Sequence, residues 1–133
     1  MPPAYDFATI ANQQDLDAKV SLRPGEFLFH EGDEADALYI VVRGVLRVMS
    51  GSAVLETVPA GGIVGEMAIV DQTMPRSASV IAGTYSELIK IDASQFLALV
   101  SATPDFALMV MRVMARRLRV MNRRYRPQAA ESL

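Results

Sequence analysis

Residues 61–80 decide how this chain is interpreted, and they read Gly61-Gly62-Ile63-Val64-Gly65-Glu66-Met67-Ala68-Ile69-Val70-Asp71-Gln72-Thr73-Met74-Pro75-Arg76-Ser77-Ala78-Ser79-Val80. A glycine pair, a strand end and a short helical stretch after Gly65 form a backbone whose free N–H groups can face an anion. Arg76 can hold a phosphate with two parallel hydrogen bonds, and Ser77 adds a hydroxyl donor beside it. Glu66 cannot bind a phosphate, but its carboxylate can accept a hydrogen bond from a sugar hydroxyl. The segment therefore predicts a nucleotide site.

The chain around this segment has the pattern of an antiparallel β structure. All eight glycines lie between Gly25 and Gly83. Short β-branched runs alternate with turn residues such as Glu31-Gly32-Asp33 and Arg43-Gly44, at spacings of roughly 8 to 12 residues that are typical of a sandwich or barrel. These runs are Phe27–Phe29, Leu38–Val42, Val45–Met49, Val54–Val58, Ser77–Ile81 and Glu87–Ile91.

Helical signals lie at both ends. Residues 1–18 contain a weak amphipathic pattern and are expected to hold a leading helix, and Asp92 or Ser94 can cap a short helix that follows the last strand run. Thr103-Pro104-Asp105 begins a second helix, which is expected to run to Tyr125 before Pro127 ends it. At 100° per residue this long helix has an apolar side and an arginine side. The apolar side carries Val110, Met114, Leu118, Met121 and Tyr125, and the arginine side carries Arg112, Arg116, Arg119, Arg123 and Arg126.

Together these residues resemble the cyclic nucleotide-binding domain shared by the catabolite activator protein, protein kinase A regulatory subunits and cyclic-nucleotide-gated channels. Gly65-Glu66-Met67-Ala68 and Pro75-Arg76-Ser77-Ala78 are similar to the family's phosphate-binding cassette, and upstream Pro24-Gly25-Glu26 and Tyr39-Ile40-Val41 are similar to its strand-turn pattern. The resemblance covers roughly residues 19–125. Val64 departs from it, because the family often has Phe before the Gly-Glu pair, and the smaller side chain is expected to loosen packing behind the cassette.

The resemblance implies a fold and a set of ligand contacts. The fold would be mainly β with flanking helices: an eight-stranded antiparallel β-roll with a short cassette helix, a leading helix and two C-terminal helices. Glu66 would bind the ribose 2′-hydroxyl and Arg76 the cyclic phosphate. Gly65, Met67, Ala68, Ser77 and Ala78 would line or cradle the ligand, which is cyclic AMP (cAMP) or cyclic GMP (cGMP), and no further cofactor is expected. Because Ser rather than Thr stands at position 77, a modest preference for cAMP is expected.

The length and composition of the chain limit its domain organisation and the classes of function it can have. The 133 residues suit a single domain, 1–133, divided into a leading helix (1–18), a β-roll (19–92) with its cassette (61–80) and C-terminal helices (93–133). With no cysteine and one histidine, the chain suggests no metal site and no nucleophile beside a base, so an enzyme is not expected. The lack of cysteine favours the reducing cytoplasm, and no apolar run approaches the roughly 18 residues of a membrane span.

The charge is segregated, which leaves a second function open. Residues 1–111 hold 6 Lys and Arg against 14 Asp and Glu, whereas residues 112–133 hold 7 Arg against one Glu. In the first hypothesis the domain is a cyclic nucleotide sensor that couples binding to movement of its long helix, with Leu118, Met121 and Tyr125 as a possible lid or as a seam for a homodimer, and regulates a partner. In the second, the Arg-rich helix binds nucleic acid or anionic membrane and the pocket is vestigial. The seven residues after Arg126 leave no room for a winged helix-turn-helix, which disfavours sequence-specific DNA reading.

Overall fold

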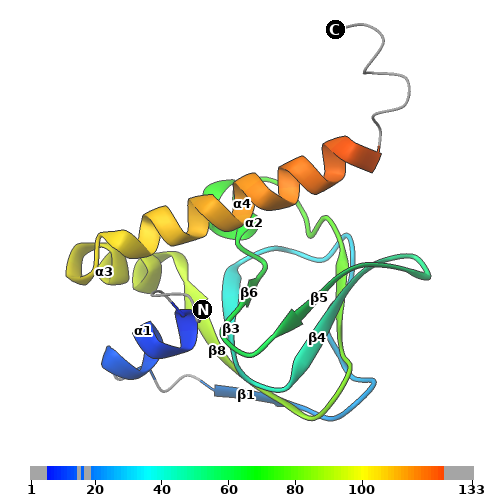
Figure 1. Cartoon of the computed structure of the whole chain (residues 1–133), viewed down its shortest axis with the longest axis horizontal. Coiled ribbons are helices and arrows are strands. Elements are labelled where there is room, and N and C mark those ends of the chain that lie inside the picture. The colour runs from blue at the N-terminus through cyan, green and yellow to red at the C-terminus, as the bar shows by residue number, and fades with distance from the viewer. Residues whose placement is uncertain (1–5, 15, 17–18, 125–133) are drawn as a thin grey trace, which may run out of the picture.

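The computed structural model describes residues 6–14, 16 and 19–124. Within them the chain forms eight strands and four helices (Figure 1). The strands are β1 (Lys19–Leu22), β2 (Phe27–Phe29), β3 (Ala37–Arg43), β4 (Val45–Ser50), β5 (Ala53–Pro59), β6 (Ile63–Val64), β7 (Ser79–Ala82) and β8 (Ser86–Asp92). The helices are α1 (Phe7–Gln13), α2 (Met67–Val70), α3 (Ala93–Ala102) and α4 (Asp105–Arg124).

The strands make two four-stranded antiparallel sheets, ordered β1-β8-β3-β6 and β2-β7-β4-β5. Side chains from both sheets, among them Val41, Leu46, Val80 and Leu88, form one buried cluster between them. The mainly β fold with eight antiparallel strands and flanking helices is confirmed. Two strands, β1 and β6, fall outside the six runs marked from composition, because strands of four and two residues are too short to show a pattern of their own.

The tight turn between β3 and β4 explains why position 44 is a glycine. Gly44 has a φ of 95°, and a Cβ there would lie 2.3 Å from both the Ser86 side chain and the Tyr85 carbonyl oxygen. Any other residue would push β8 away from this turn.

The helices cover one end of the roll with a second buried cluster. Phe7 and Ile10 of α1 pack with Ile40 of β3, and Phe106 of α4 meets Phe7 edge to face with ring centroids 5.8 Å apart. Within the described part of the expected leading segment 1–18, the helix covers Phe7–Gln13 and is capped by the Asp6 carboxylate. Asp92, not Ser94, caps α3, and its exchange of hydrogen bonds with Gln95 completes a capping box.

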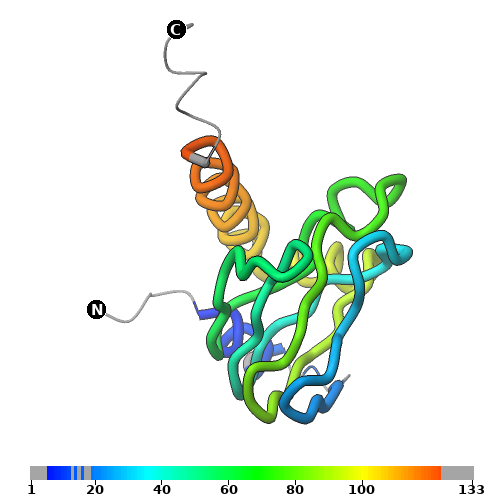
Figure 2. Tube along the Cα trace, turned by 90° about the vertical axis from the view of Figure 1, so that its right-hand side faces the viewer, coloured from blue at the N-terminus to red at the C-terminus, as the bar shows by residue number. Residues whose placement is uncertain are grey.

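The long helix α4 lies across the top of the molecule in the view of Figure 1, and Figure 2 shows it rising away from the strands. Its first half is anchored, because Phe106, Met109, Val110 and Val113 are buried in the second cluster. Its second half extends past the roll, and Tyr125, where the helix was expected to end, lies outside the described residues. Among the described helices, none is by itself both long and apolar enough to cross a membrane.

Candidate functional site

The cassette joins the two sheets, running from β6 through Gly65 and α2 to β7. Gly65 has a φ of 78°, a backbone conformation that side chains rarely adopt. A Cβ at Gly65 would also lie 2.7 Å from Nη1 of Arg76 and 3.1 Å from the carbonyl oxygen of Ala37. Glycine is therefore needed here both for the turn and for the close approach of Arg76.

Arg76 is pulled into the molecule, with 5% of its surface exposed. Its Nη2 donates to the carbonyl oxygen of Ala37 at 2.9 Å and lies 3.7 Å from the Asp36 carboxylate. Its Nη1 donates to the carbonyl oxygen of Gly65 at 3.4 Å, and the guanidinium carbon lies 3.9 Å from the centroid of the Phe29 ring. These contacts hold the guanidinium in one orientation beside the cassette.

The charge of Arg76 is not fully balanced by these contacts. Burial lowers the pKa of Arg76, and the neighbouring Tyr39, Asp36, Asp33 and Glu66 only partly oppose this effect. Its Nε is buried without a hydrogen-bond partner among the described residues. A buried donor without an acceptor is costly, and an anionic ligand would supply the missing acceptor. The residue suits a phosphate-binding role.

Backbone donors lie in the same segment. Within the part of the chain that the structure describes, the N–H groups of Glu66, Ser77 and Ala78 form no hydrogen bond. Ala68 and Ala78 are buried, whereas Met67 and Ser77 are exposed. The residues of the expected cassette thus come together around Arg76, and whether each one contacts a ligand stays a prediction.

Glu66 is buried with 4% of its surface exposed, and it is held by a residue that the sequence analysis did not single out. Nη1 of Arg117, from α4, donates to Oε1 of Glu66. The same guanidinium contacts both carboxylate oxygens of Glu56 on β5, through Nε at 2.8 Å and Nη2 at 3.2 Å, and Nη2 donates to the carbonyl oxygen of Ile63 at 2.7 Å. Burial alone would lower the pKa of Arg117, but the hydrogen bonds and charges of Glu56 and Glu66 outweigh it and raise that pKa.

A signal for Arg117 is present in the sequence. Arg112, Arg116, Arg119 and Arg123 form the expected arginine side and are exposed. Arg117 instead follows Val110 and Val113 by seven and four residues, so it lies on the buried side of the helix. A charged residue on the apolar side of an amphipathic helix indicates a specific partner.

Of the three possible lid residues, the two that the structure describes are largely exposed. Leu118 and Met121 are 55% and 56% exposed, and Tyr125 lies outside the described residues. The apolar surface of Leu118 and Met121 is available to a ligand or to another chain, and the lid role of the three residues stays a prediction.

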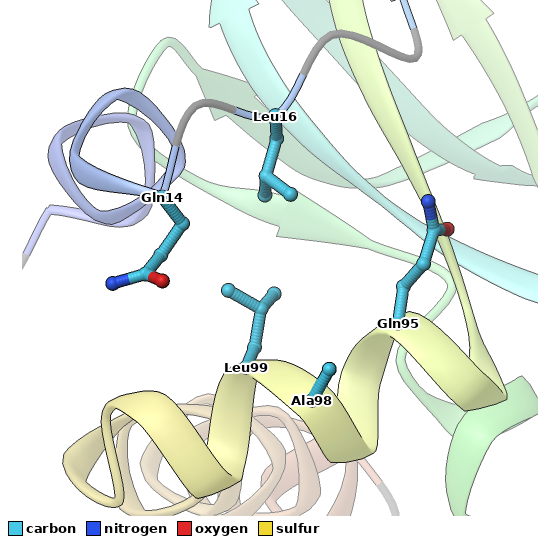
Figure 3. Close-up of a pocket in the computed structure, with 5 residues that line it drawn as sticks. All are labelled: Gln14, Leu16, Gln95, Ala98 and Leu99. Carbon is cyan, nitrogen blue, oxygen red and sulfur yellow. The ribbon is translucent and has the colours of Figure 1, made fainter.

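Among the residues that the structure describes, neither Glu66 nor Arg76 lines either of two cavities, although Asp36 and Pro75 of the second one adjoin Arg76. One, of about 170 Å³, separates α1 from α3 and is lined by Gln14, Leu16, Gln95, Ala98 and Leu99 (Figure 3). The other, of about 340 Å³, lies between the β2–β3 loop and the cassette loop, and Glu34 and Asp36 contribute to its lining. Carboxylates disfavour a phosphate in that second cavity, so neither cavity replaces the cassette as the candidate site.

Comparison with known proteins agrees with this geometry. The family model described as the cyclic nucleotide-binding domain matches residues 19–103. The chain belongs to the cyclic nucleotide-binding domain family. It is 32% identical over 98 residues to the cAMP-activated global transcriptional regulator CRP of Salmonella typhimurium, a match that covers 70% of this chain and 47% of CRP. It is also 31% identical over 118 residues to the Pycsar effector protein XpPycTIR of Xanthomonas perforans, covering 82% of this chain and 38% of that protein.

Solved structures give the same fold. The Thermus thermophilus catabolite activator protein superposes with a TM-score of 0.76 at 26% identity, over 93% of this chain and 60% of that one. The cyclic nucleotide-binding domain is a regulatory and not a catalytic fold, although some matching relatives carry enzyme names, such as Lysophospholipase NTE1 of Chaetomium globosum. This chain spans about half or less of the two curated relatives described above.

Proposed function

We propose that this domain is a sensor that binds cAMP in preference to cGMP and transmits binding through α4 to a partner. The observation that carries the proposal is Arg76, a buried guanidinium with an unpartnered Nε beside free backbone N–H groups of the cassette. Such a site binds a compact anion better than any neutral ligand, because both the charge and the orphaned donor are then satisfied.

The other ligand contacts follow the same logic. Glu66 is a buried carboxylate one residue after the Gly65 carbonyl that Arg76 contacts, so an acceptor for a sugar hydroxyl lies close to the phosphate donor. Ser77 is exposed next to Arg76, and the family resemblance links serine at this position with cAMP. These features together favour a cyclic nucleotide over a free phosphate.

Coupling to α4 has a direct structural basis. Arg117 joins this helix to Glu66, so a ligand that contacts Glu66 also acts on the helix. The effector is proposed to be another protein or a second copy of this chain bound along the exposed part of α4. CRP is named as a transcriptional regulator, and a DNA-linked role for this chain would require a segment beyond the domain described here.

Calorimetric titration with cAMP and cGMP tests the proposal. Wild-type protein should bind cAMP more tightly than cGMP, and Arg76→Ala should lose roughly 2 to 5 kcal/mol of binding free energy, because a partly buried phosphate would lose its charged partner. Arg23→Ala, at an arginine whose side chain is 86% exposed, is the matched control and should bind as wild type does. Folded Arg76→Ala that binds cAMP normally would refute the assignment of the cassette.

The second hypothesis retains one supporting observation, the exposed arginine side of α4. If that side binds nucleic acid or anionic membrane, the affinity should fall steeply as salt rises and should not depend on Arg76. The affinity of a cyclic nucleotide for the cassette should instead depend strongly on Arg76 and only weakly on salt.

A further inference from the structure

Glu56 lies where a β-strand of this roll would ordinarily present an apolar residue. On β5 it shares a face with Val58, which is buried, and across the ladder it opposes Val48, which packs against the core between the sheets. Its side chain is nonetheless 31% exposed and is paired only with Arg117 among the described residues. A carboxylate at such a position has a cost in desolvation, so its contact needs a reason.

The geometry of the Arg117 guanidinium gives a reason for the contact with Glu56. Nε and Nη2 form a parallel pair of hydrogen bonds with the two oxygens of Glu56, a fork that fixes the plane and rotation of the group. Nη2 is further held by the Ile63 carbonyl oxygen at 2.7 Å. With one edge fixed in this way, Nη1 is directed at Glu66. The contact with Glu56 therefore fixes the position of Nη1 of Arg117, which donates to Glu66.

Glu66 in turn has one oxygen engaged. Oε1 accepts from Arg117, and no hydrogen bond to Oε2 is seen within residues 6–14, 16 and 19–124. A carboxylate held at one oxygen by a fixed donor cannot rotate freely, so its second oxygen has a defined direction. If Glu66 accepts from the ribose, as the proposed function holds, that second oxygen is the acceptor for the 2′-hydroxyl.

We propose that Glu56 is a positioning residue for the ribose site, which acts through Arg117 to orient the Glu66 carboxylate toward the 2′-hydroxyl of the nucleotide. This inference rests on the proposed function and extends it. Recognition of the ribose then depends on three segments at once: β5 with Glu56, the cassette with Glu66, and α4 with Arg117. A ligand that lacks the 2′-hydroxyl should gain nothing from this arrangement.

The test compares cAMP with its 2′-deoxy analogue by calorimetry. Wild-type protein should bind cAMP about tenfold or more tightly than the analogue, because a hydrogen bond to a charged group is lost. Glu56→Gln keeps the size of the side chain but weakens the fork, so this ratio should fall to about threefold or less. The affinity for the 2′-deoxy analogue should stay within about twofold of wild type, because that ligand does not use the oriented oxygen.

A second variant keeps the test independent of how well the first one folds. Arg117→Lys retains the charge, but a single ammonium group cannot reach two carboxylates and a carbonyl in fixed directions, so the ratio should fall there too. Glu31→Gln and Arg116→Lys, both at exposed positions, are the matched controls and should leave the ratio unchanged.

The outcomes separate the two proposals. If wild-type protein binds cAMP and the ratio stays at its wild-type value in both variants, the positioning role is overturned while nucleotide sensing stands. Equal weakening of both ligands would also overturn it, because that result indicates a merely structural contact. If wild-type protein binds neither nucleotide, the proposed function fails, and the role of Glu56 fails with it.

Discussion

The guanidinium of Arg76 stacks on the ring of Phe29, with 3.9 Å between its central carbon and the ring centroid. Phe29 ends β2, which pairs with β7 directly after the cassette, so the charge at the centre of the cassette is supported from the neighbouring strand. A cation over an aromatic face is stabilised most when water is excluded, and Arg76 is buried. The Phe29 ring thus helps to keep a positive charge inside the roll before a ligand arrives.

Replacement of this ring by an aliphatic side chain tests the relationship. Phe29→Leu keeps an apolar group but removes the π face, and we expect the free energy of unfolding to fall by about 1 to 2 kcal/mol and cAMP binding to weaken. Chemical denaturation and calorimetry measure the two effects. Phe27→Leu, at a more exposed position on the same strand that stacks on His30 and not on Arg76, is the control for the loss of a ring. Equal effects of both changes would contradict a special role for Phe29.

Gly65 should be more sensitive to substitution than other glycines of similar backbone conformation. Gly65→Ala places a Cβ 2.7 Å from Arg76 Nη1, so Arg76 must shift and cyclic nucleotide affinity should fall by at least tenfold. Gly25→Ala is the matched control, because Gly25 also has a positive φ, 86°, but no atom lies within 4 Å of the added Cβ. Both variants should lose roughly 1 to 2 kcal/mol of stability from the strained backbone, and only Gly65→Ala should lose binding.

The exposed apolar stripe at the end of α4 should contribute to ligand affinity if it acts as a lid. Leu118→Ser with Met121→Ser should leave the melting temperature unchanged, since both side chains are exposed, but should lower cAMP affinity by about tenfold. Leu97→Ser, at another exposed leucine on α3, controls for a general loss of apolar surface.

Hydrogen exchange and sedimentation complete that test. Residues 112–124 should exchange more slowly with cAMP bound than without it in the wild type, and this difference should shrink in the double variant. A change in sedimentation without a change in affinity would instead assign the stripe to a second copy of the chain. If nothing changes, neither role stands.

The cap of α3 gives a prediction about stability alone. Asp92→Ala removes the acceptor for the Gln95 N–H, found at 2.8 Å, and should lower the free energy of unfolding by about 1 kcal/mol. Ser94→Ala should have little effect, because Ser94 lies inside the helix and does not cap it. Thermal unfolding of the two variants distinguishes the two candidate caps, and a larger loss for Ser94→Ala would contradict the observed arrangement.

Asp71, in the cassette loop, gives a prediction about pH. Oδ1 of Asp71 accepts hydrogen bonds from the hydroxyl and the N–H of Thr73, which hold the pKa of Asp71 below its ordinary value. A lowered pKa in the folded state favours folding above the pKa of the unfolded chain, and this contribution is lost as the pH falls through the folded value. Thr73→Val removes the hydroxyl, so a carboxyl titration by NMR should show the midpoint of Asp71 moving up toward its ordinary value. An unchanged midpoint would contradict the assigned cause.

Much of the β-roll could be predicted from the sequence because its signals are local. Runs such as Leu38–Val42 are β-branched and apolar, and each turn has residues that suit it, as Gly44 does between β3 and β4. The pairing order β1-β8-β3-β6 could not be read in this way, because β1 and β8 are far apart in the chain and pair only once the sheet has formed. The resemblance to a family, and no local rule, supplied the count of eight strands.

The candidate site, like the fold, could be predicted from the sequence only in part. Gly65, Glu66, Arg76 and Ser77 lie within one short segment, so residue type and spacing alone predict their association with a nucleotide. Arg117 is 51 residues from Glu66, and Glu56 belongs to an otherwise ordinary strand run. The only sequence signal of Arg117 and of Glu56 is a charged residue on the apolar face of its helix or strand. No local pattern could pair one with the other.

The cassette and the amphipathic long helix could be predicted from the sequence, because turns and hydrophobic periodicity depend on residues close together in the chain. Which arginine of α4 turns inward, and which groups it contacts, depends instead on long-range packing. That choice depends on where α4 comes close to β5 and β6, which is set by the packing of Phe106, Met109 and Val110 into the helical core. Packing brings the guanidinium of Arg117 between Glu56 and Glu66, and three charges distant in sequence then become one site.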